Sequence, residues 1–467
     1  MRSGIFIQSG LRGMDREVAL KKIAKFLPYS LVLFKSDFSS QEDLKELIRR
    51  IRKIYVTENG VEEPVIAVDQ EGGNVVRLDW LDYNPSNLFL GEFNNTNFTS
   101  YVASLTGYQL SDLGIHWNLA PVLDLLNPYN QVILERSFGS DIKKVSDHGS
   151  AYIKGLQSHG VHATAKHFPG HGSVMDDSHL VLPSDKRGFE AIINDAYPFI
   201  SAIEAGVHSV MLSHVLYTSL DPDFPASISP SIQNLLRDRF KFDGLIITDS
   251  IEMKALSDNF SKKEIVDQTI LHHVDLIESA DLDNSIELAD IISKVDYEKF
   301  EEKMRRLQIF QKSISKSRYR PMPDLLNAVE MTFPVVRRNV RLDPSRQIDM
   351  IFLDISEESI VTDHNYPITR VLEELDHLGF DIRFHYSLGS IDTLENSNQV
   401  IFVGRNEHLK NRVWKINEFC KGRKCAFIST SVDRDVGVID PSIGYVSAFS
   451  QKSSTITGAV IKILGDL

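Results

Sequence analysis

The chain has 467 residues, of which 42% are hydrophobic and 25% are charged, and its formal net charge is −13. A chain of this length exceeds what one hydrophobic core usually organises, so we expect two domains. Acidic residues outnumber basic ones, and no stripe of lysine and arginine accompanies them. Both observations argue against nucleic acid and anionic membranes as partners. A neutral small-molecule substrate fits this composition better.

The cysteines and the N-terminus indicate a reducing compartment. The only cysteines, Cys420 and Cys425, are spaced C-x4-C, and they lack the second pair of ligands that a structural zinc site needs. Residues 1–15 contain no apolar core with a cleavage site of the secretory type. No run of about 18 apolar residues occurs that would suit a membrane-spanning helix. The sequence therefore predicts a cytoplasmic protein.

Short apolar runs that alternate with helical patterns dominate the first 300 residues. Helices are expected over 15–26 and 41–55, and each later apolar run also leaves room for a helix behind it. Continuous apolar runs suit parallel strands that are covered on both faces, and eight of them match a (β/α)8 TIM-type barrel of the α/β class. The eight expected strands span residues 4–7, 31–34, 65–68, 115–119, 162–165, 209–212, 245–248 and 274–277.

A second and smaller α/β pattern follows the barrel. A charged helical segment over 297–315 ends at the breaker sequence SRYRPMP, and a further helical segment is expected up to Arg338. The later alternation predicts a doubly wound α/β domain without a glycine-rich phosphate loop. Its expected strands span 348–355, 382–386, 399–404 and 425–430, and its expected helices span 370–378, 413–420 and 454–464. We therefore divide the chain into a barrel over 1–320, a linker over 321–345 and a C-terminal domain over 346–467.

Polar residues occur repeatedly at the ends of the expected barrel strands. In a (β/α)8 barrel the carboxyl ends of all strands share one rim, and active sites lie on that rim. Each acid alone is as readily explained as a helix N-cap, but their shared position favours a site. The residues at or just beyond strand ends are Asp69, Lys166, His167, Ser213, His214 and Asp249.

The densest polar stretch covers residues 166–179 and reads KHFPGHGSVMDDSH. So many polar groups after an apolar strand belong on a loop that a rigid scaffold presents. A metal site is an alternative, because three histidines and Asp177 are crowded there. A proline and a glycine lie between the first two histidines, so no helix can align them as a ligand pair. We therefore expect no metal and no other cofactor.

These motifs resemble glycoside hydrolase family 3. The residues that carry the resemblance are KHFPGHG followed by DSH, DQEGG at 69–73 and TDS at 248–250, and the likeness extends to about residue 300. The chain looks most like the β-N-acetylglucosaminidase branch of the family. One position departs from the pattern, because Asn74 stands where the family usually has arginine. Arg77 is still present, so the departure concerns loop packing more than chemistry.

The resemblance implies a role for each matching residue. Asp249 would be the nucleophile, and His179, paired with Asp177, would be the general acid/base. An unperturbed imidazole pKa of about 6.5 suits a group that must both give and accept a proton near neutral pH. The neighbouring aspartate can orient the ring and stabilise the imidazolium. The residues implied to hold the sugar and its N-acetyl group are Asp69, Arg77, Arg136, Lys166 and His167.

The function implied by the resemblance is that of a retaining exo-β-N-acetylglucosaminidase. It would release terminal N-acetylglucosamine from small β-linked oligosaccharides, of the chitobiose type or from peptidoglycan, through a covalent glycosyl-enzyme. A β-glucosidase or β-xylosidase of the same family and a catalytically silent sugar-binding protein remain alternatives. Phosphorolysis in place of hydrolysis and a homodimer built through the C-terminal domain also stay open.

Overall fold

The computed structural model describes two parts of the chain. In the first part it describes residues 3–60, 64–81, 85–174, 181–295 and 300–314. In the second part it describes residues 335–338, 342–343, 346–353, 382–385, 394, 399–404, 413–429, 439–447, 459–460 and 463–464. The helix expected over 370–378 lies outside the described residues, and so does most of the helix expected over 454–464.

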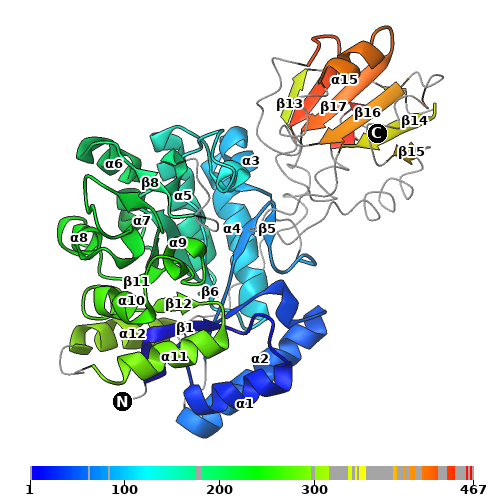
Figure 1. Ribbon diagram of the computed structural model, residues 1–467. Helices are drawn as coiled ribbons and strands as arrows, with labels where there is room; N and C mark the ends of the chain where they lie inside the picture. The colour runs from blue at the N-terminus through cyan, green and yellow to red at the C-terminus, as the bar shows by residue number, and fades with distance from the viewer. Residues whose placement is uncertain are drawn as a thin grey trace.

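The first part forms the predicted (β/α)8 barrel. Its eight strands are parallel and follow the order β11-β9-β7-β6-β3-β2-β1-β12, and a bridge between Ile247 and Leu276 joins the two ends of this sheet. Figure 1 shows the barrel in blue to green. Its strands are β1 (Ile7–Gly10), β2 (Ser30–Leu33), β3 (Val65–Val68), β6 (Trp117–Asn118), β7 (His162–Phe168), β9 (Ser209–Leu212), β11 (Leu245–Thr248) and β12 (Ile277–Ser279).

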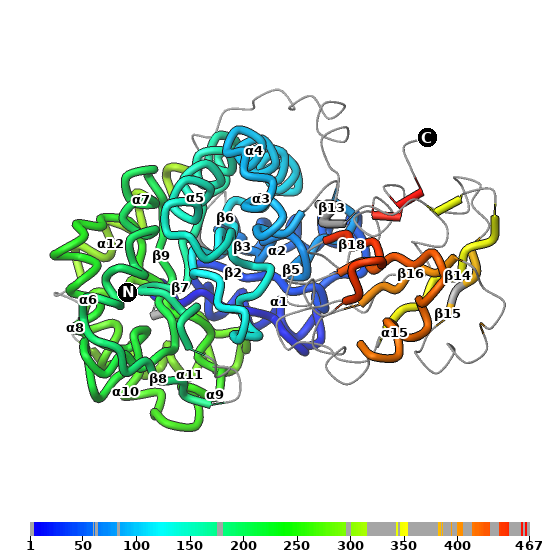
Figure 2. Tube along the Cα trace, turned by 90° about the horizontal axis from the view of Figure 1, so that it is seen from above, coloured from blue at the N-terminus to red at the C-terminus, as the bar shows by residue number. Residues whose placement is uncertain are grey.

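Helices surround the strands. Their ends follow local capping chemistry: Asp15 accepts backbone hydrogen bonds at the start of the first helix, and Gly60, with φ of 67°, ends the second one beyond the predicted residue 55. Figure 2 shows α4, α5 and α7 outside β6, β7 and β9. The helices are α1 (Arg16–Phe26), α2 (Gln41–Asn59), α3 (Asn87–Phe93), α4 (Thr96–Asp112), α5 (Ile142–Gln157), α6 (Phe189–Asp195), α7 (Tyr197–Glu204), α8 (Pro230–Asn234), α9 (Lys254–Ser257), α10 (Lys262–Thr269), α11 (Leu282–Ile292) and α12 (Glu301–Ile314).

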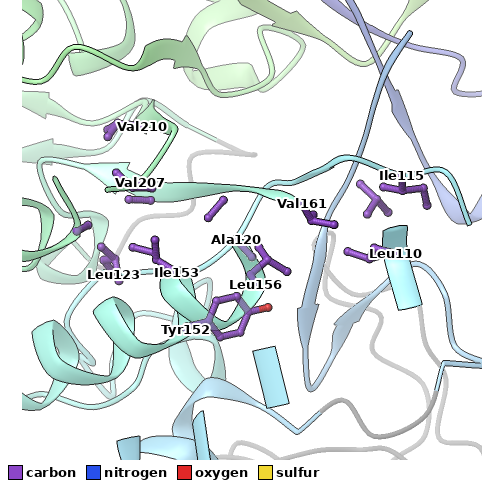
Figure 3. Packing of buried hydrophobic residues seen from close by; sticks show 14 of the residues in the cluster. Leu110, Ile115, Ala120, Leu123, Tyr152, Ile153, Leu156, Val161, Val207 and Val210 are labelled. Carbon is purple, nitrogen blue, oxygen red and sulfur yellow. The ribbon is translucent and has the colours of Figure 1, made fainter. Parts of the chain in front are cut away.

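Alternating side chains divide the barrel core into an inner and an outer layer. Trp117 points inward, since its Nε1–H donates to Thr164 and Ser209 on the next two strands. The outer layer packs the opposite strand faces against the helices. Figure 3 shows Ile153 and Leu156 of α5 in this outer layer. The continuous apolar runs in the sequence follow from this burial on both faces.

Five of the eight expected barrel strands had wrong boundaries, although those of β2 and β6 differ by only one or two residues. Residues Ser3–Phe6 form a 3-10 helix, and β1 starts only at Ile7. β7 continues to Phe168, so Lys166 and His167 belong to a strand rather than to a loop. β12 begins at Ile277, because it pairs in register with β1. This shift places Glu278, which the sequence reading had not considered, inside a barrel strand.

The C-terminal strands form one sheet, as expected of a doubly wound α/β domain. Its order is β13-β18-β17-β16-β14-β15, and every pairing except that of β13 is parallel. Val335–Arg338, expected to be a helix within the linker, is instead a strand that pairs with β18; the other domain boundaries stay predictions. The described elements are β13 (Val335–Arg338), β14 (Ile348–Phe352), β15 (Ile382–His385), β16 (Gln399–Gly404), α15 (Val413–Phe419), β17 (Lys424–Ser429) and β18 (Gly444–Ser447). Across the described ranges of both parts, no helix combines the length and apolarity needed to cross a lipid bilayer.

Candidate active site

A cavity of about 280 Å³ opens at the carboxyl ends of the barrel strands. A larger cavity, of about 460 Å³, is lined by residues such as Tyr29 and Leu307 and holds no carboxylate or histidine, so we place the chemistry in the smaller one. Six predicted site residues line the smaller cavity together: Asp69, Arg77, Arg136, Lys166, His167 and Asp249. The other two, Asp177 and His179, lie outside the described residues.

Lys166 joins two acids that follow β3. Its Nζ lies 2.8 Å from Asp69 Oδ1 and 2.7 Å from Glu71 Oε1. Burial alone would lower the pKa of Lys166, but the two carboxylates raise it above its ordinary value. The ammonium group is therefore held charged in the cavity wall.

Glu71 also forms a forked ion pair with Arg136, which lies in the 3-10 turn Leu134–Arg136. Arg136 Nε and Nη2 donate to the two Glu71 oxygens at 2.8 and 2.9 Å. Burial alone would raise the pKa of Glu71, but Arg136 and Lys166 hold it below its ordinary value. The sequence reading missed Glu71, although it is the glutamate of the DQEGG motif. It aligns both cations beneath the cavity.

Asp124 positions the two described histidines of the KHFPGHG motif. Its Oδ2 lies 2.7 Å from His167 Nδ1, and its two oxygens also accept from the backbone N–H groups of His167 and His171. Because an ionised carboxylate only accepts, His167 Nδ1 carries a hydrogen. Burial lowers the pKa of the His171 ring to about 4, against the opposing charge of Asp124. The sequence reading missed Asp124, which ends the run NLAPVLD at residues 118–124.

Asp249 follows β11 directly and faces His167 across the cavity. Its Oδ2 lies 3.9 Å from His167 Nε2, and its Oδ1 accepts the Ser250 N–H at 2.7 Å. Burial alone would raise the pKa of Asp249, but the nearby His167, His214, Ser250 N–H and Lys166 lower it to about 2. The carboxylate is therefore ionised at neutral pH.

Arg77 lines the cavity and directly follows the tight hairpin formed by β4 (Gln70–Gly72) and β5 (Val75–Val76). Its Nη2 lies 3.5 Å from Asp69 Oδ2. Gly73 turns the hairpin with φ of 60°, and a Cβ there would lie 2.7 Å from the Cβ of Ser86. Asn74, the departure from the family pattern, donates its side-chain hydrogen bond to the buried Glu135. Asn74 thus contributes to loop packing and not to the cavity.

Two further acids line the cavity without having been predicted. Glu252 follows Asp249 closely, and its carboxylate accepts hydrogen bonds from Ser250 and from the Ala280 N–H, both at 2.9 Å. Glu278 lies in β12 and is 4% exposed. The strand predicted over 274–277 stopped one residue short of Glu278, so the apolar pattern did not reveal this residue.

His214 is better explained by packing than by contact with a ligand. Its ring nitrogens lie 2.8 Å from Ser227 Oγ and 2.9 Å from the Ser250 carbonyl oxygen, and it does not line the cavity. Within the part of the chain that the structure describes, no three histidine, cysteine or acidic side chains are grouped so that they could hold a metal ion.

Comparison with known proteins gives the same fold and a family. The model of the glycosyl hydrolase family 3 N terminal domain matches residues 10–314. A beta-hexosaminidase of Idiomarina loihiensis is 36% identical over 232 residues, which cover 48% of this chain and 68% of that protein. A beta-hexosaminidase of Tolumonas auensis is 38% identical over 232 residues, covering 48% of this chain and 67% of that protein.

Solved structures extend the likeness of fold to the whole chain. A family 3 beta-N-acetylglucosaminidase from Paenibacillus has a TM-score of 0.89 at 24% identity and covers 100% of this chain and 96% of that one. A beta-glucoside phosphorylase has a TM-score of 0.78 at 19% identity and covers 99% of this chain and 92% of that one. At these identities the likeness shows the fold alone. The family match over residues 10–314, together with the relatives above, shows that the chain belongs to glycoside hydrolase family 3 and is a glycoside hydrolase.

Proposed function

We propose that this protein is a retaining exo-β-N-acetylglucosaminidase that acts on small β-linked oligosaccharides through a covalent glycosyl-enzyme. The observation that carries the proposal is the Asp249 carboxylate, ionised and 3.9 Å from His167, in a cavity at the carboxyl end of the barrel. A nucleophile for glycoside hydrolysis must be ionised and must face the sugar. Asp249 meets the first requirement and lines the same cavity as the predicted sugar-binding residues.

The rest of the cavity suits a neutral, polyhydroxylated ligand. Asp69 and Glu71 offer acceptors, while Lys166, Arg77 and Arg136 offer donors, and ion pairs between them hold both sets in place. A volume of about 280 Å³ is small for a ligand site and suits one sugar ring. An exo-acting enzyme that binds only the terminal residue agrees with that size.

The proposed reaction has two steps. Asp249 attacks the anomeric carbon as the glycosidic C–O bond breaks, and His179 gives its proton to the leaving oxygen. A water molecule then attacks the glycosyl ester while His179 takes the proton back, and the sugar leaves with its β-configuration retained. Asp177 would orient the imidazole. A neutral imidazole avoids the like-charge repulsion that a second carboxylate would exert on Asp249.

Substrate choice is tested with p-nitrophenyl glycosides. The name of the two curated relatives favours an N-acetylhexosamine over glucose or xylose. We expect kcat/KM on the β-N-acetylglucosaminide to exceed that on the β-glucoside and the β-xyloside by at least about 100-fold. A preference for the glucoside or xyloside would favour the alternative enzyme, and sugar binding without turnover would favour a silent binding protein. Product analysis with and without phosphate separates hydrolysis from phosphorolysis.

The proposal extends to the cellular compartment and the oligomeric state of the protein. Cys420 and Cys425 are both buried free thiols, which agrees with a reducing, cytoplasmic environment. We propose a homodimer formed through residues 346–467. Light scattering of the whole chain tests the dimer, since a monomeric mass at micromolar concentration would contradict it.

A further inference from the structure

Among the carboxyl groups on the cavity, one differs from the rest. Four of them accept hydrogen bonds from described residues, and three cations of the cavity wall, Arg77, Arg136 and Lys166, form ion pairs with two of these four. The fifth belongs to Glu278, whose Oε2 is buried without a hydrogen-bond partner among the described residues. The four satisfied groups belong to Asp69, Glu71, Asp249 and Glu252.

The fold fixes Glu278 in the inner layer of the barrel. Its N–H donates to Thr248 Oγ1 at 2.9 Å, and its carbonyl oxygen accepts from the Ile251 N–H at 3.2 Å. In register it pairs with Gln8 of β1, and Gln8 in turn pairs with Ser30, whose side chain it contacts. Successive side chains of a strand point to opposite faces, so these partners share the inner face. The Glu278 carboxyl group is therefore held on the cavity by an anchored backbone.

The surroundings of this carboxyl group favour its protonated form. Burial is the largest cause that raises its pKa well above the ordinary value, and the carboxylates of Asp69, Asp249 and Glu252 raise it further. Lys166 opposes this shift, but its ammonium group already bonds to other carboxylates. An ionised, unpaired carboxylate in such a place would be costly, whereas a protonated one gains a donor. Arg12, from the loop after β1, also lines the cavity and shows no ion pair among the described contacts.

We propose that Glu278 is a substrate-binding residue that keeps its proton and donates a hydrogen bond to a hydroxyl group of the bound sugar, on the side of the ring that faces Asp69. This inference rests on the proposed function, because it requires a sugar in the cavity. A protonated acid beside Asp249 can contact the sugar without adding a negative charge next to the nucleophile. It therefore selects glycosides that carry a hydroxyl group at that position.

Another explanation is purely structural. The Oε1 of Gln8 is also buried without a partner among the described residues, so the Glu278 proton could serve Gln8 instead of a ligand. The two explanations differ in what a substitution changes. If Glu278 bonds only to Gln8, substituting Glu278 would change the stability of the protein alone. If Glu278 bonds to the ligand, the substitution would change the preference between sugars.

The decisive experiment compares wild type, Glu278→Gln and Glu278→Met on aryl β-N-acetylglucosaminides that each lack one ring hydroxyl. We expect wild type to prefer the parent over one deoxy substrate by about tenfold or more in kcat/KM. Glu278→Gln, which can still donate, should keep this preference, and Glu278→Met should lose it by becoming slower on the parent alone. An unchanged preference in Glu278→Met, or no penalty for any deoxy substrate in wild type, would overturn the proposal.

Infrared spectroscopy tests the proton independently of turnover. At neutral pH the wild type should show the C=O stretch of a protonated carboxylic acid that Glu278→Gln lacks, and N-acetylglucosamine should shift it. Glu46→Gln, on the surface of α2, is the matched control and should keep the band. Absence of the band in wild type would refute the proposal. If wild type hydrolyses no glycoside, the proposed function fails, but this band and calorimetric binding of the deoxy sugars still decide the role of Glu278.

Discussion

The Nδ1 atom of His167 lies 2.7 Å from Oδ2 of the buried Asp124. Through this contact a residue that no ligand can reach fixes the ring whose other nitrogen lies 3.9 Å from Asp249. The arrangement links the loop after β6 to the ends of β7 and β11. We therefore expect the geometry at Asp249 to depend on Asp124.

Asp124→Asn should lower kcat/KM about 10- to 100-fold, or roughly 1.4–2.8 kcal/mol, because the amide cannot hold the imidazole as a carboxylate does. The loss should fall mainly on kcat if Asp124 acts through ring position in the transition state. Asp112→Asn, at the exposed end of α4, is the matched control. Equal losses in both variants, or a change confined to KM, would contradict the role given to Asp124.

Asp249→Ala should lower kcat by at least about 10³-fold, or roughly 4 kcal/mol, while the protein stays folded. Sodium azide should restore part of the activity and give the α-glycosyl azide, because azide enters from the face that the carboxylate has left. Chromatography of the products and circular dichroism of the variant check both points. Near-normal turnover without azide would show that another group is the nucleophile.

His179→Gln should affect substrates according to their leaving groups. A general acid matters most when the leaving oxygen is a poor leaving group, so activity on chitobiose should fall by about 10²- to 10⁴-fold. A dinitrophenyl glycoside needs little protonation and should lose far less in the first step. The measurement is kcat/KM for a series of aryl glycosides and chitobiose. An equal loss across the series would argue against His179 as the acid.

Glu71→Gln should destabilise the protein by about 3–5 kcal/mol, because it leaves two buried cations without their shared carboxylate. The folded-state pKa of Glu71 lies below its ordinary value of 4.5, so its contribution is present above pH 4.5 and is lost as the pH falls below it. Urea unfolding of wild type and Glu71→Gln at neutral and acidic pH measures the difference between their free energies of unfolding. Glu17→Gln, which breaks an exposed pair with Arg50, should change stability little, and a similar loss in both variants would refute the prediction.

Sequence patterns could predict the barrel because strands that are buried on both faces appear in the sequence as continuous apolar runs. Val65–Val68, Ser209–Leu212 and Leu245–Thr248 were found with their correct bounds. The predicted bounds of β7 and β12 were wrong because polar residues continue both strands into the cavity. Lys166 and Glu278 are strand residues that tertiary contacts stabilise, and a local apolar pattern cannot reveal them.

The site could be predicted in part for the same reason. Residues just beyond apolar strands, such as Asp69 and Asp249, stand out in the sequence and do meet at one cavity. Glu71 and Asp124 did not stand out, since their importance comes from partners 65 and 43 positions away in the chain. Such pairing depends on how the barrel closes, which no single stretch of sequence contains.

The most direct test of this account is mass spectrometry of the protein treated with a 5-fluoro N-acetylglucosaminyl fluoride, which forms the glycosyl ester faster than water removes it. We predict one added sugar per chain and, after proteolysis, attachment at Asp249. Attachment at Asp69 or Glu278, or turnover with inversion and no attached sugar, would contradict the proposed mechanism.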